Sequence, residues 1–271
     1  MLFQGIVIIN YSLQVIWIVL QLLVAIFLLY KMFKTKRYNL LPLILFFILS
    51  SIRIVFLIIV PSLRPIYLVL VQFPSIFLIV FTKLIFYRYK KSPFKIFLIT
   101  LIIVRTIDFI IRLNFNISIP MTTELSESNL IYYYYILFSI SISYLLSHGW
   151  LGFISIRYYL SLRSEKIAEW LKKRYFLIGL SSFVYCINIF VYYLFPYTNV
   201  DIFDFPNVIY SYMLLGFTIF YSVGMFIAWI MPDKLKRYFD KNFQPIEETE
   251  FIEEELMERI NRERKNSNKN Q

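Results

Sequence analysis

The segment NLLPLILFFILSSIRIVFLIIV, from Asn39 to Val60, contains 22 residues and one charge, that of Arg53. A run of about 20 apolar residues is long enough to cross the hydrocarbon core of a bilayer as an α-helix. A helix on the surface of a soluble protein would instead carry polar residues along one whole face, and this segment does not. It therefore predicts a transmembrane helix.

Apolar blocks of similar length recur along the whole chain. The composition agrees with this pattern, because 59% of the 271 residues are hydrophobic and 17% are charged, whereas soluble domains are about half apolar and about one quarter charged. We therefore predict an all-α fold, a polytopic membrane protein built as a seven-transmembrane-helix bundle. The expected spans are residues 11–30, 39–60, 66–87, 92–112, 129–156, 175–196 and 207–231.

The charges between the blocks predict an orientation. Half of the 28 basic residues lie in three connecting segments, residues 31–38, 88–95 and 157–174, each with a net charge of +4. The segments on the opposite side carry +1, −2 and −2. Positively charged loops remain in the cytoplasm, so we expect the N-terminus outside and a multi-pass protein in the cell membrane. The same placement explains the net charge of +11 without a nucleic-acid partner.

Two domains follow from this topology: a transmembrane domain at residues 1–231 and a cytoplasmic tail at 232–271. Pro232 stands where a helix can open, and apolar residues then repeat at helical spacing. They are Leu235 and Phe239 in a first segment, and Ile252, Leu256 and Ile260 in a second. Such amphipathic segments are typical of helices that lie on the inner membrane surface, with membrane lipids as partners.

The connecting segment at 157–174 contains another amphipathic stretch, Ser164–Lys173, in which Ile167, Trp170 and Leu171 share one helical face. Ser164 is a residue type that caps helix starts. Two interpretations remain open. In the first, which is simpler, the stretch extends a neighbouring helix and touches anionic headgroups. In the second, the stretch and the tail together bind a cytoplasmic protein partner.

The most unusual feature lies in the span at 92–112. Arg105, Asp108 and Arg112 follow one another at i, i+3 and i+7, so one helical face carries all three. Ionisable residues inside a membrane are costly, face the protein interior and are functional hypotheses by default. Arg53 of the second span and Gln72 of the third are expected at a similar depth, in the outer half of the bilayer.

If these faces converge, three guanidinium groups surround one carboxylate and one amide. This surplus of positive charge suits an anionic or zwitterionic small ligand, because guanidinium groups bind carboxylates and phosphates bidentately. The candidate site is therefore Arg53, Gln72, Arg105, Asp108 and Arg112. The alternative is a structural ion-pair network in which Asp108 bridges Arg105 and Arg112, while Arg53 extends toward lipid headgroups.

Small residues predict close contacts between spans. Ser139, Ser143 and Ser147 form a stripe at i, i+4 and i+8, and Gly216 and Gly224 lie in the last span. We expect neighbouring helices to approach closely at all five positions.

Catalytic and metal motifs are missing from the sequence. One cysteine, Cys186, and one histidine, His148, cannot build a zinc site, and His148 is interpreted as an interior histidine. There is no His-Glu-x-x-His or Gly-x-Ser-x-Gly motif. We therefore expect no enzymatic activity, no cofactor and no metal.

The expected topology resembles those of G-protein-coupled receptors, microbial rhodopsins and PQ-loop carriers, but their motifs do not recur. Phe86-Tyr-Arg-Tyr-Lys90 lacks the acidic residue that precedes the receptors' arginine, the last span has no lysine for retinal, and no Pro-Gln pair occurs. The sequence favours a receptor-like or sensory bundle. A small-solute transporter or permease and a non-catalytic, lipid-interacting scaffold are the alternatives.

Overall fold

The computed structural model describes residues 2–59, 64–87, 91–115, 127–163, 167–194 and 205–241, and every regular element in these ranges is a helix. The elements are α1 (Leu2–Thr35), η1 (Tyr38–Leu40), α2 (Leu41–Ile59), α3 (Arg64–Phe86), α4 (Phe94–Phe115), α5 (Glu127–Tyr144), the π-helical turn η3 (Leu145–Gly149), α6 (Trp150–Leu162), α7 (Glu169–Cys186), α8 (Asn188–Leu194), α9 (Phe205–Ile230) and α10 (Asp233–Phe239).

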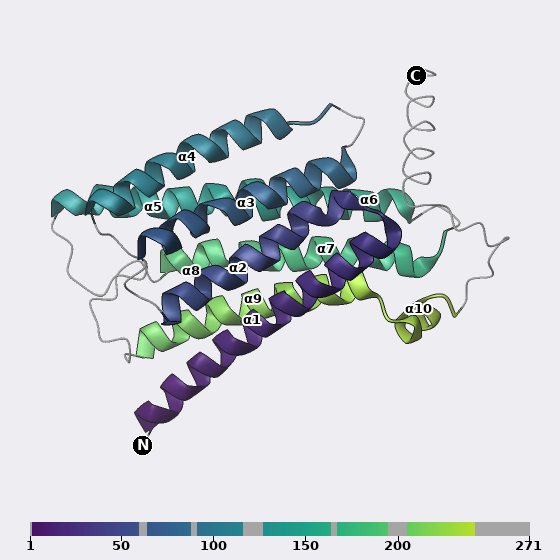
Figure 1. The fold of residues 1–271 in the computed structure, drawn as a ribbon, viewed down its shortest axis with the longest axis horizontal. Coiled ribbons are helices and arrows are strands. Elements are labelled where there is room, and N and C mark those ends of the chain that lie inside the picture. Colours follow the sequence, from purple (N-terminus) through teal and green to yellow (C-terminus); the bar gives the residue numbers. More distant parts are fainter. Residues whose placement is uncertain are drawn as a thin grey trace.

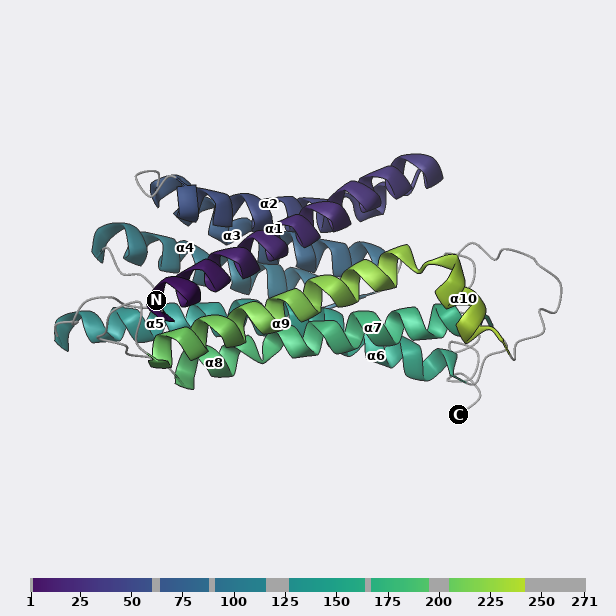
Figure 2. The same ribbon diagram turned by 90° about the horizontal axis from the view of Figure 1, so that it is seen from below.

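The long helices run roughly along one common axis and form a bundle (Figure 1). Most sequence neighbours pack against each other, and α1 also packs against α9, which brings the first and last long helices together. Figure 2 shows α1 and α2 on one side of the bundle and α6, α7 and α8 on the other. The helix α4 lies at the edge, in contact with α3 and α5.

Several helices are long and apolar enough to cross a membrane, which supports a multi-pass membrane protein. Among the described residues, five stretches meet this condition: Ser12–Thr35, Ile66–Phe86, Leu130–Leu162, Glu169–Tyr193 and Tyr212–Ile230. The two other expected spans are not among these five stretches. The apolar part described for the second span is shorter, Tyr38–Arg53, and α4 carries Arg105, Asp108 and Arg112 in its apolar stretch.

Two boundaries differ from the sequence-based expectation. The fifth span continues from α5 through η3 and α6 to Leu162, beyond the expected end at 156. The amphipathic stretch after it is not a separate helix, because α7 begins at Glu169 with Ala168 as its N-cap. The second half of the amphipathic stretch is therefore the first turn of α7, as expected if the stretch extends a neighbouring helix. The expected cap, Ser164, lies outside the described residues.

The tail begins with a helix at the expected place, α10, and Pro232 is its N-cap. This helix packs against the start of α7. The backbone N–H of Trp170 donates to Asp240 Oδ1 at 3.2 Å, and Lys236 Nζ lies 5.3 Å from the centroid of the Trp170 ring. These contacts join the tail to the transmembrane bundle. The second amphipathic segment, with Ile252, Leu256 and Ile260, lies outside the described residues.

Close helix contacts form at some of the expected small residues. A Cβ atom on Gly224 of α9 would lie 2.7 Å from Ser181 Cβ of α7, so the prediction for Gly224 is confirmed. The prediction for Gly216 is wrong, because a Cβ there would meet no atom of the described residues within 4 Å. A similar contact between α6 and α7 was not predicted: a Cβ on Gly179 would lie 2.7 Å from Ile156. The serine stripe Ser139, Ser143 and Ser147 is buried.

The two glycines of α9 provide a matched pair for a stability test. Gly224→Ala is expected to destabilise the bundle by about 1–3 kcal/mol, because its methyl group overlaps Ser181 and forces α7 and α9 apart. Gly216→Ala places its methyl group in open space and gains helix propensity, so it should leave stability unchanged or raise it by up to about 1 kcal/mol. Thermal unfolding of both variants in detergent measures the difference. Equal melting temperatures would contradict the close contact.

Candidate functional site

The candidate site is built on α4, whose two faces differ sharply in polarity. Arg105, Asp108 and Arg112 are 6%, 0% and 7% exposed, so all three point into the protein. The opposite face presents apolar residues such as Ile103 and Ile107, which are 54% and 41% exposed. A helix with charges inside and isoleucines outside matches an apolar surrounding. The cost of exposing charges to an apolar surrounding therefore orients α4 so that its charges face the interior of the bundle.

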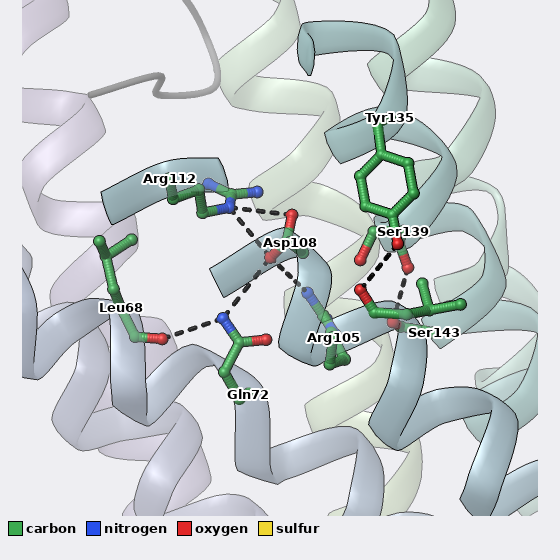
Figure 3. A network of polar contacts seen from close by, with 9 residues as sticks. Leu68, Gln72, Arg105, Asp108, Arg112, Tyr135, Ser139 and Ser143 are labelled. Atoms are coloured by element: carbon green, nitrogen blue, oxygen red, sulfur yellow. Dashed lines mark hydrogen bonds and ion pairs between the residues drawn. The ribbon is translucent and has the colours of Figure 1, made fainter. Parts of the chain in front are cut away.

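Asp108 is the centre of a compact polar network (Figure 3). Arg112 Nε donates to both carboxylate oxygens of Asp108 at 3.1 Å. Arg105 NH1 lies 3.6 Å from Asp108 Oδ2, and Gln72 Nε2 donates to the same oxygen at 3.5 Å. Gln72 is held in place by α3 itself, because it also donates to the carbonyl of Leu68 at 3.0 Å. Four of the five predicted site residues are thus in contact.

Arg53 reaches the same interior from α2. It lies close enough to Arg105 for the two like charges to affect each other, although it does not join the direct contacts around Asp108. Its other electrostatic neighbours are tyrosines, among them Tyr67 and Tyr185. Two guanidinium groups of α4 therefore contact the Asp108 carboxylate, and a third, from α2, lies near one of them, Arg105. The two arginines nearest to Asp108 compete for its charge, and Arg53 has no carboxylate among these neighbours.

Several polar atoms of this region have no hydrogen-bond partner within the described part of the chain. They are Nε of Arg53, Nε and NH1 of Arg105, and Oε1 of Gln72, all of them buried. Buried polar atoms normally have a partner, since leaving one without costs roughly 1–3 kcal/mol. The arrangement can therefore accept hydrogen-bonding groups from another molecule, and the free groups are mainly donors.

A second polar cluster lies around His148 and was not predicted as a unit. His148 occupies the π-helical turn η3, a type of irregularity that is frequent at functional sites. Its ring centroid lies 4.3 Å from that of Tyr185, 5.0 Å from Tyr221, 5.5 Å from Phe46 and 5.8 Å from Tyr144. These aromatic rings come from four different helices and enclose the imidazole. We call these five residues the aromatic cluster.

The aromatic cluster connects to the arginines. Arg53 lies in the electrostatic neighbourhood of His148 and Tyr144. The hydroxyl of Tyr144 also interacts with those of Tyr185 and Tyr192. Tyrosines normally gather at the membrane interfaces, so tyrosines in the middle of spans were the sequence signal for this cluster.

The buried Nδ1 atom of His148 has no hydrogen-bond partner among the residues that the structure describes, which gives a test of its role. Its ring serves packing, so His148→Phe is expected to unfold within a few degrees of wild type. His148→Ala leaves a cavity among the surrounding rings and should cost about 2–5 kcal/mol, in the range of other large-to-small core changes. Thermal unfolding in detergent separates the two variants. If the phenylalanine variant were as unstable as the alanine variant, the imidazole would be making a polar contact that packing does not replace.

No metal-binding cluster of three or more His, Cys, Asp or Glu side chains occurs within the residues that the structure describes. Comparison of the chain with models of protein families, with curated proteins and with solved structures gave no match.

Proposed function

We propose that this chain is a seven-span receptor-like or sensory protein of the cell membrane, which binds an anionic or zwitterionic small ligand in the outer half of its bundle. The observation that carries the proposal is the set of buried guanidinium nitrogens on Arg53 and Arg105 that have no hydrogen-bond partner among the described residues, although Arg105 NH1 lies 3.6 Å from Asp108 Oδ2. A ligand carboxylate or phosphate would satisfy these donors. The proposal assigns the chain a binding role and no catalytic one.

The proposed topology adds α2 and α4 to the five apolar stretches as membrane spans. Its support for α4 is the direction of the charges, since a helix that hides Arg105, Asp108 and Arg112 and exposes isoleucines behaves as a span. α10 lies at the end of the bundle opposite the N-terminus (Figure 1), as an external N-terminus and a cytoplasmic tail require. The contact between α10 and Trp170 is the candidate place for a cytoplasmic protein partner.

The topology is testable because the chain has a single cysteine, Cys186. In a Cys186→Ser background, a cysteine placed at Ser126 should react with a membrane-impermeant maleimide in intact cells. A cysteine placed at Lys91 should react only after the membrane is permeabilised. The reverse pattern, or equal labelling of both positions in intact cells, would contradict the orientation.

A transporter is the second candidate, and one structural observation favours it. The sixth span is interrupted: α7 ends at Cys186, and α8 starts at Asn188 after a turn at Ile187. Interrupted spans often mark substrate sites in transporters.

Flux measurements separate these two functions. The purified protein would be reconstituted into liposomes, and small carboxylates would be assayed both for binding and for uptake. A receptor is expected to bind without uptake beyond protein-free liposomes. Uptake that depends on the protein and is lost in Arg53→Gln would replace the receptor proposal with transport.

A further inference from the structure

The outer surface of the bundle carries a groove between α3 and α4, where α4 lies at the edge of the fold (Figure 1). Its volume is about 260 Å³, and it is open to the surroundings. Apolar residues form its sides, among them Val69 and Phe73 of α3 and Ile102 and Phe109 of α4. Val69, Phe73 and Ile102 are 41%, 41% and 45% exposed, so the groove opens where a span faces lipid.

Three polar residues, Gln72, Arg105 and Thr106, also line this groove. Arg105 is the most buried of them, with only 6% of its surface exposed. Within the described part of the chain, Nε and NH1 of Arg105 donate no hydrogen bond and Oε1 of Gln72 accepts none. The groove therefore combines an apolar entrance on the membrane side with an incompletely satisfied cation at its inner end.

We propose that this groove binds a single-chain anionic amphiphile, a long-chain carboxylate, that enters sideways from the outer leaflet. The inference rests on the proposed function and names both the ligand class and its route of entry. The carboxylate would accept hydrogen bonds from Arg105, and the alkyl chain would lie along the apolar sides. Charge complementarity selects an anion, because the unsatisfied N–H groups of Arg105 are hydrogen-bond donors on a positively charged guanidinium group.

The dimensions fit one chain and not a whole phospholipid. Pockets that enclose a drug-sized ligand span about 300–1,000 Å³, and this groove is somewhat smaller at about 260 Å³. It would hold the headgroup and the first part of the chain, and the remainder would stay in the bilayer. Arg105 lies seven residues before Arg112 on α4, or about 10 Å along the helix axis. The carboxylate would thus sit below the headgroup layer, where a buried arginine compensates for its charge.

Photolabelling in nanodiscs of phosphatidylcholine tests the inference. The probe is a hexadecanoate with a diazirine close to its carboxylate, and labelled peptides are identified by mass spectrometry. Labelling is expected on the parts of α3 and α4 that line the groove. Unlabelled hexadecanoate should compete, whereas hexadecanol and hexadecyltrimethylammonium should not, because they lack the negative charge.

Two neighbouring residues of α4 give a matched pair of variants. Ile102→Trp fills the groove and should reduce labelling about tenfold. Ile103→Trp adds the same ring to an exposed position outside the lining and should change labelling by no more than about twofold. Both side chains face outward, so neither variant disturbs the buried network. Equal effects of the two variants, or even labelling of all lipid-facing helices, would overturn the groove as a site.

A soluble carboxylate separates this inference from the proposed function. Suppose butyrate raises the melting temperature of the wild type but not of Arg53→Gln, while the hexadecanoate probe fails to label the groove. The anion site would then stand, and entry from the lipid would be refuted. If neither carboxylate acts on the protein, both proposals fail. If the probe labels the groove and only unlabelled hexadecanoate reduces this labelling, both proposals are supported.

Discussion

Asp108→Asn is expected to destabilise the protein by about 3–5 kcal/mol, the range found when one partner of a buried ion pair is removed. Asp108 is fully buried and is the one carboxylate in the described network, where it contacts both Arg105 and Arg112. The asparagine keeps the shape but leaves two buried guanidinium groups without a counter-charge. Thermal unfolding in detergent should show a loss of at least about 5 °C, by the usual relation between free energy and melting temperature.

Asp233→Asn is the matched control for this change. Asp233 also forms an i,i+3 ion pair, with Lys236 at 3.2 Å, but its side chain is 83% exposed. Exposed ion pairs contribute little to stability, so this variant should melt with the wild type. If Asp108→Asn also melted with the wild type, the network would not be a buried charge cluster.

Arg53→Gln is expected to weaken anion binding by about tenfold to a hundredfold, which corresponds to one hydrogen bond of about 1.5–3 kcal/mol to a charged group. The fold should remain intact, because the electrostatic neighbours of Arg53 include tyrosines and other cations but no carboxylate. Equilibrium binding of a radiolabelled short carboxylate to purified protein measures the effect.

Arg157→Gln serves as the control, since Arg157 is an exposed arginine of α6 and is not one of the candidate site residues. It should bind the carboxylate as the wild type does. A similar loss of affinity in both variants would point to general surface attraction, and unchanged binding in Arg53→Gln would remove Arg53 from the site.

The sequence was sufficient to predict the long helices and the cluster on α4. Both depend on local patterns, because a 20-residue apolar block and the i, i+3, i+7 spacing of Arg105, Asp108 and Arg112 are visible without knowledge of tertiary contacts. The contact between Gln72 and Asp108 was predicted only because the two residues were expected at a similar depth in the bilayer, and the structure contains this contact. Depth does not fix the rotation of a helix, which is why Arg53 could not be placed relative to Asp108 from sequence.

Other features depend on contacts that no local pattern encodes. Gly216 and Gly224 are equivalent in sequence, yet only Gly224 meets a neighbouring helix. The aromatic cluster brings together Phe46, Tyr185 and Tyr221, which are far apart in the chain, around a histidine in a π-helical turn. The boundary at α7 was misjudged because the charges near Glu169 and Lys172 suggested a loop, while their ion pair at 2.7 Å lies within the helix.

The structure contains elements of both interpretations of the charged cluster. Asp108 bridges Arg105 and Arg112, as the ion-pair network requires. Arg53, however, is directed into the protein near Arg105 and its Nε has no partner among the described residues. We therefore assign Asp108 and Arg112 to the support of the site, and Arg53 and Arg105 to the ligand.

Thermal unfolding of the wild type, Arg53→Gln and Asp108→Asn, each with and without a short carboxylate, tests this division most directly. We predict that Asp108→Asn melts well below the other two without ligand, and that the carboxylate raises the melting temperature of the wild type but not of Arg53→Gln. If Arg53→Gln is as unstable as Asp108→Asn and no anion stabilises the wild type, the cluster is purely structural and the ligand site does not exist.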